Sequence, residues 1–170
     1  MRKCGAWRAN SAALWLEGIP AGAWLAAHDE ALEALPALLS VLQAADQPEQ
    51  LRLDCLWSLV GCAELDNRCV SDVWLQMLRN SIEPDALRSA SSTCLALHGA
   101  GDTLDAQIAL IDDADTPESV RLSCARALNC LWDSDVANKI EPAFQLLIQD
   151  PHTPSSIKSE CMKAEFEPPF

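Results

Sequence analysis

The segment Asp115–Leu131, DTPESVRLSCARALNCL, decides the fold because the rest of the chain repeats its pattern. Thr116 can accept a hydrogen bond as a helix N-cap, Pro117 suits the first helical position, and Glu118 complements the positive end of the helix dipole. A helix is therefore predicted to start here. Its apolar residues recur at spacings of three and four and form one stripe: Val120, Cys124, Ala127, Leu128 and Leu131. An apolar stripe is unfavourable in water, so this helix is predicted to bury it by packing against other helices.

Three other segments share this pattern. Each has a proline, an aliphatic residue three positions later, a cation directly after it, and a small residue four positions beyond the aliphatic one. They begin at Pro48, Pro84 and Pro154, so that with Pro117 the four prolines are 36, 33 and 37 residues apart. This period is typical of solenoids built from helix pairs.

An apolar helical segment precedes each proline helix, and acidic or polar turns join the two. These first helices are predicted around Leu35–Leu42, Val73–Leu78, Leu104–Ile111 and Ile140–Ile148. Ser71 or Asp72 is predicted to cap the second of them. In the helix after Pro84, serine and threonine hydroxyls are expected to bond to backbone carbonyls four residues earlier.

The repeated pattern resembles the HEAT-like repeat family, in particular the short bilin-lyase-type repeats of bacteria, whose second helix opens with a proline, an acidic residue and a Val-Arg pair. The resemblance covers residues 31 to 165. It implies a right-handed α-solenoid of about four helix pairs. It also implies that Arg52, Arg88 and Arg121 bond to turn aspartates in a ladder between repeats, with Asp46 and Asp115 among the acceptors.

The ends of the chain depart from the repeat. Residues 1–30 predict an N-terminal helical cap containing Trp7, Trp15 and Trp24, and residues 166–170 predict a short tail. Lys158 replaces the arginine in the last copy and cannot make the forked contact of a guanidinium, which is typical of a degenerate end repeat. The 170 residues are therefore predicted to form one all-α domain.

Charge limits the classes of partner. Twelve basic and twenty-five acidic residues give a formal net charge of −13, which repels phosphate backbones, so no nucleic-acid partner is predicted. No apolar run is long enough for a membrane helix, and no membrane partner is predicted. The acidic residues have two interpretations: they keep the protein soluble, or they attract a partner with a basic surface.

The eight cysteines could form disulfides, but their positions favour another interpretation. Cys55, Cys124 and Cys161 occupy the small-residue position of three repeats, where Ser91 stands in the fourth. A thiol packs as a small apolar group, so these residues are predicted in the core of a cytoplasmic protein. The first eight residues are positively charged, but Arg8, Asn10 and Glu17 interrupt any signal-peptide core.

The sequence contains no motif that carries chemistry. Its three histidines lie in separate segments without zinc-ligand spacing, and the glycines around Gly99 follow a helix, not a strand. No metal, cofactor or catalytic residue is therefore predicted. The resemblance leaves one alternative open, a lyase or a protein that handles a chromophore or another small molecule. A structural domain from a larger assembly is a third alternative.

The preferred hypothesis is a noncatalytic protein that binds a basic protein partner, as an adaptor, inhibitor or immunity-type protein does. Acidic residues at the turns and helix starts would attract the partner, and tryptophans would anchor it unless they only fill the core. The oligomeric state stays open. The candidate residues are Asp46, Glu49, Trp57, Trp74, Asp85, Asp112, Asp113, Asp115, Glu118 and Trp132.

Overall fold

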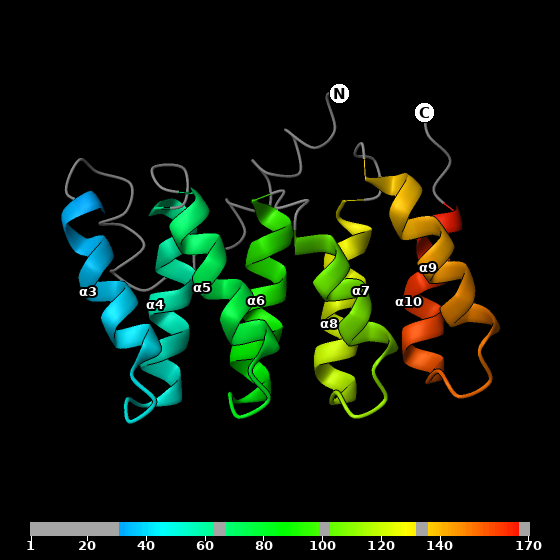
Figure 1. The fold of residues 1–170 in the computed structure, drawn as a ribbon, viewed down its shortest axis with the longest axis horizontal. Helices are drawn as coiled ribbons and strands as arrows, with labels where there is room; N and C mark the ends of the chain where they lie inside the picture. The colour runs from blue at the N-terminus through cyan, green and yellow to red at the C-terminus, as the bar shows by residue number, and fades with distance from the viewer. Residues whose placement is uncertain (1–30, 63–66, 99–102, 132–135, 167–170) are drawn as a thin grey trace. The chain divides into compact units, whose positions relative to one another are not determined.

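The structure, a computed structural model, describes residues 31–62, 67–98, 103–131 and 136–166. These residues form eight α-helices and no strand, which confirms the all-α prediction for this part of the chain (Figure 1). The helices are α3 (Ala31–Gln43), α4 (Glu49–Cys62), α5 (Asn67–Arg79), α6 (Asp85–Leu97), α7 (Leu104–Asp112), α8 (Glu118–Asn129), α9 (Ala137–Gln149) and α10 (Ser155–Phe166). The predicted cap in residues 1–30 and the tail residues 167–170 lie outside the described residues. Phe166 belongs to α10 and not to the tail.

The chain divides into two compact units, with the boundary between Val70 and Ser71, inside α5. The first unit contains α3 packed against α4. The second contains most of α5 and all of α6 to α10. Among the described residues, no helix is both long and apolar enough to cross a membrane.

The four turns before the proline helices share one backbone bond. In each, an amide donates to the carbonyl three residues earlier: Gln47 to Ala44 (3.1 Å), Glu83 to Asn80 (3.1 Å), Thr116 to Asp113 (3.2 Å) and Thr153 to Asp150 (3.3 Å). The proline follows directly. The repeat found in the sequence is therefore also a repeat of backbone geometry.

Pro84 and Pro117 are the N-caps of their helices, one position earlier than predicted. Pro117 has φ −52° and ψ 139°, outside the helical region, and its carbonyl accepts the amide of Arg121 at 3.0 Å. A proline suits this place because its fixed φ is compatible with the geometry and its missing N–H is not needed. The prediction that Thr116 caps the helix is wrong, since its hydroxyl donates to Asp113 Oδ2 at 2.7 Å.

The arginine after each aliphatic residue ties the second helix of a pair to the end of the first. Arg52 Nε donates to the Leu42 carbonyl at 2.8 Å, Arg88 Nε to that of Leu78 at 3.1 Å, and Arg121 Nε to that of Ile111 at 2.8 Å. All three arginines are buried. Their acceptors belong to the last turn of a helix, where carbonyls have no partner within the helix.

This geometry corrects the predicted ladder. The hydrogen bond of Arg121 runs to a backbone carbonyl within its own pair, so Asp115 is not its acceptor. The turn carboxylate influenced by the positive charges of both Arg88 and Arg121 is that of Asp113. The bond expected between Arg52 and Asp46 stays a prediction.

Serine side chains connect neighbouring second helices instead. In the second unit α8 packs against α6, and α10 packs against α8. Ser119 Oγ donates to Asp85 Oδ2 at 2.9 Å, and Ser156 Oγ donates to Glu118 Oε1. Each of these bonds joins the second residue of one helix to the first residue of the preceding second helix. The starts of α6, α8 and α10 therefore lie side by side (Figure 1).

The small-residue position is buried in every repeat, as predicted. Cys55, Ser91, Cys124 and Cys161 are all in the core, together with the aliphatic residues Leu87, Val120 and Ile157. In α6, Ser91 Oγ donates to the Leu87 carbonyl at 2.8 Å and Thr93 Oγ1 to the Ser89 carbonyl at 3.2 Å, which confirms the predicted bonds to residues four positions back.

The start of α5 differs from the prediction. The helix begins at Asn67, so Ser71 and Asp72 lie inside it and neither caps it. The stretch before Ser71 was not recognised as helical because its polar residues Asn67 and Arg68 hide the apolar periodicity. Val70 is nevertheless fully buried.

Replacing Arg121 by lysine tests the arginine bond. Lysine keeps the charge but cannot donate from the Nε position, so the Ile111 carbonyl loses its buried donor. We expect the free energy of unfolding to fall by about 1–3 kcal/mol, measured by urea denaturation followed by circular dichroism. Arg79→Lys, at an exposed position at the end of α5, should cost less than about 0.5 kcal/mol. Equal losses in the two variants would contradict the assignment.

Candidate functional site

The described residues include four buried cysteine thiols. No cluster of histidine, cysteine or carboxylate side chains among them could hold a metal ion. Burial raises the pKa of the Cys94 thiol well above its ordinary value, that of Cys124 to about 11, and that of Cys161 to about 12. These three thiols are therefore protonated at neutral pH and are poor nucleophiles.

The seven carboxylates predicted for the binding surface are all exposed, and two of them lie in the first unit. Asp46 and Glu49 belong to the α3–α4 turn and the start of α4. The other five belong to the second unit, around the start of α6, the end of α7 and the start of α8: Asp85, Asp112, Asp113, Asp115 and Glu118.

Asp113 has a structural role in its turn. Its Oδ2 accepts the Thr116 hydroxyl at 2.7 Å, and its Oδ1 accepts the Asp115 amide at 3.0 Å. These hydrogen bonds, the Thr116 bond foremost, lower the pKa of Asp113, and the nearby Arg121 and Arg88 charges add to the effect. Asp150 does the same in the last turn, where the His152 amide and then the Thr153 hydroxyl lower its pKa.

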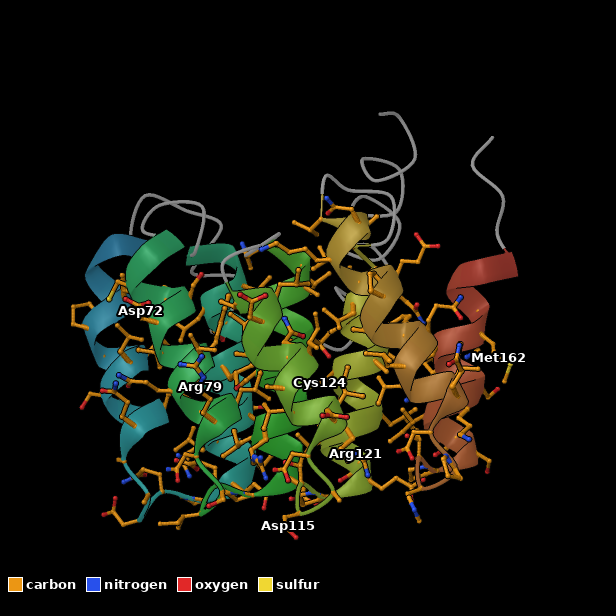
Figure 2. The ribbon with its side chains drawn as sticks, turned by 45° about the vertical axis from the view of Figure 1, so that its right-hand side comes forward. Asp72, Arg79, Asp115, Arg121, Cys124 and Met162 are labelled. Atoms are coloured by element: carbon orange, nitrogen blue, oxygen red, sulfur yellow. The ribbon has the colours of Figure 1, made fainter. Side chains whose placement is uncertain are left out.

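Asp85 and Glu118 each stand at the first position of a helix and accept a serine hydroxyl from the second helix of the following pair. Both carboxylates stay exposed while they make these contacts. Asp112 and Asp115 are exposed on either side of Asp113. Figure 2 shows Asp115 at the tip of the turn, with Arg121 and Cys124 successively farther along α8. We call Asp85, Asp112, Asp113, Asp115 and Glu118 the acidic edge.

The tryptophan predictions have different outcomes. Trp74 is fully buried, with its ring 5.1 Å from that of His98, so it cannot anchor a partner and this prediction is wrong. The interpretation that the tryptophans fill the core applies to this residue. Trp57 is half-buried in the first unit, and its role stays a prediction. Trp132 lies outside the described residues.

An open depression of about 430 Å³ lies beside the acidic edge. It is lined by Arg79 from the end of α5, by Asp105, Ala106, Ala109 and Leu110 from α7, and by Asp113. Because residues from the ends of α5 and α7 line the same depression, the α5–α6 and α7–α8 turns are neighbours. Figure 1 shows both turns at the same end of their helices, and Figure 2 shows Arg79 on α5.

Two notable side chains were missed from the sequence. Ile82, in the α5–α6 turn, is 90% exposed. Glu160, in contrast, is buried on α10, where its carboxylate accepts Lys163 Nζ at 2.7 Å and Asn129 Nδ2 at 3.1 Å. Burial alone would raise the pKa of Glu160, but these two hydrogen bonds and the nearby Arg126 charge lower it overall. The spacing of three between Glu160 and Lys163 was the available sequence signal.

No family model matches this chain, and the comparisons with curated proteins and with solved structures find no match either.

The lowered pKa values of Asp113 and Asp150 predict acid sensitivity. Because the folded-state pKa lies below the unfolded value, the charged carboxylates stabilise the fold above about pH 5, and this contribution is lost as the pH falls through about 4 and below. The melting temperature of Asp113→Asn/Asp150→Asn should lie below that of the wild type at pH 7, with the gap closing towards pH 3. Asp72→Asn/Asp105→Asn removes the same charge outside the turns and should not reproduce this pattern. A gap that does not change with pH would contradict the prediction.

The raised thiol pKa values predict slow alkylation. With iodoacetamide at neutral pH, Cys94, Cys124 and Cys161 should react at least about tenfold more slowly than the exposed Cys69 and Cys130. Peptide mass spectrometry gives the rate at each position, and labelling in urea should remove the differences. Equal rates in the native protein would show that the helices open readily.

Proposed function

We propose that this chain is a noncatalytic HEAT-like repeat protein that binds a protein with a basic surface. The proposal includes a right-handed α-solenoid of about four helix pairs with an N-terminal helical cap. The recurring turn, the arginine bond at the same position of three pairs and the side-by-side second helices of the second unit support it. A cytoplasmic location is part of the proposal, supported by the buried cysteine thiols.

The acidic edge is the observation that carries the binding proposal. Its carboxylates come from successive pairs, and the Ser119–Asp85 and Ser156–Glu118 bonds join the helix starts that carry two of them. Arg88 and Arg121 come from the same region, but they are buried on carbonyls and do not present their charge at the surface. The edge therefore presents a concentrated negative charge.

Such a surface speeds encounter with a cationic partner more than it strengthens the final complex. Exposed charges steer association, while desolvated contacts supply most of the affinity. A protein that must occupy a basic target quickly, such as an inhibitor, an immunity-type protein or an adaptor, fits this property. The buried, protonated thiols offer no support for the alternative of a thiol-dependent lyase.

Affinity capture tests the proposal. The tagged protein should retain a basic protein from its native lysate at low salt and release most of it at high salt, because screening weakens exposed charge contacts. With that partner purified, Asp112→Asn/Asp115→Asn should reduce the association rate constant by roughly three- to tenfold.

The matched control is Asp72→Asn/Glu141→Gln, which removes the same charge from exposed positions outside both the acidic edge and the depression beside it. This variant should associate at nearly the wild-type rate. Retention that is insensitive to salt, or equal effects of the two double variants, would refute binding through the acidic edge.

A further inference from the structure

Ile82 stands at the tip of the α5–α6 turn and is 90% exposed, more than any other large apolar side chain in the described part of the chain. The next values are 70% for Leu146 and 42% for Leu51. A single exposed apolar residue is common on protein surfaces and needs no explanation by itself. The backbone bond that holds Ile82 recurs in other turns of the chain.

Three turns hold this tip position with the same bond. The Ile82 amide donates to Asn80 Oδ1 at 3.1 Å, the Asp115 amide to Asp113 Oδ1 at 3.0 Å, and the His152 amide to Asp150 Oδ1 at 3.0 Å. The turn therefore forms equally with a carboxylate or an imidazole at its tip. Neither folding nor packing requires isoleucine at position 82.

The same bond fixes where Ile82 sits. Its amide is held by Asn80, and the Glu83 amide donates to the Asn80 carbonyl at 3.1 Å, so the turn is braced on both sides of the isoleucine. A β-branched side chain also has few rotamers. Burying this side chain against a partner therefore costs little conformational entropy, as is favourable for an anchor.

The surroundings of Ile82 define the chemistry of a matching partner. Asp85 follows three residues later, and the neighbouring α7–α8 turn carries Asp112 and Asp115 beyond the depression shared by Arg79 and Asp113. The apolar tip thus lies beside the acidic edge. Its complement is an apolar pocket bordered by lysine or arginine side chains.

We propose that Ile82 is the apolar anchor of the acidic edge and inserts into such a pocket on a basic protein partner. This inference rests on the proposed function. The carboxylates of the acidic edge raise the association rate, and Ile82 is the residue that supplies affinity. Complete burial of one isoleucine side chain contributes roughly tenfold or more to affinity.

Site-specific photo-crosslinking tests which surface the partner covers. Benzoylphenylalanine placed at position 82 should cross-link the protein that the wild type retains at low salt, through a peptide that contains basic and apolar residues. The same probe at position 146, another exposed apolar residue, should not. Equal cross-linking from both positions, or a cross-link from position 82 to a second copy of this chain, would overturn the proposal.

Binding kinetics separate the anchor from the charges. Ile82→Ser should raise the dissociation rate constant roughly tenfold and leave the association rate nearly unchanged, whereas Leu146→Ser should change neither. Both variants should keep the wild-type melting temperature because the replaced side chains are exposed. If the partner binds Ile82→Ser as tightly as the wild type, the anchor fails while the proposed function stands. If the wild type retains no basic protein, both fail together.

Discussion

The hydrogen bond from an arginine Nε to a backbone carbonyl ten residues earlier is the interaction on which three of the four helix pairs depend. The acceptor lies in the last turn of the first helix, where carbonyls lack partners and the helix dipole is negative. A guanidinium supplies both the hydrogen-bond donor that the carbonyl lacks and a positive charge that the negative helix end favours. Because the donor stands four residues after the proline, the bond fixes the second helix against the end of the first.

This bond also shapes the surface charge. Three of the twelve basic residues, Arg52, Arg88 and Arg121, are buried to make it, whereas the candidate carboxylates of the turns and helix starts stay exposed. The surface is therefore more acidic than the composition alone suggests. Burying Arg52, Arg88 and Arg121 leaves the turn end of the pairs with more exposed carboxylates than exposed cations, although Arg79 at the end of α5 stays exposed.

Much of the fold could be predicted from the sequence because each repeat has the same types of side chain at the same positions. The proline, the aliphatic residue, the cation and the small residue located the second helices, and the burial of Cys124 and Cys161 followed from their shared position. The partners of the arginines could not be predicted in the same way. A backbone carbonyl such as that of Ile111 has no signature in a sequence, whereas a nearby aspartate does.

The surface was predicted less well because periodicity locates helix faces and not turn tips. The acidic edge was accessible to sequence reasoning, since acidic residues favour turns and helix starts. Trp74 was misplaced because a large aromatic side chain looks the same in a sequence whether it fills the core or anchors a partner.

Ile82 was overlooked because it belongs to no apolar stripe. In its turn Asn80 accepts the amides of Ile82 and Glu83, so neither bond uses the side chain of Ser81 or Ile82, and both residues are exposed. Their side chains can therefore change without cost to the fold, which makes such positions suitable for setting the choice of partner.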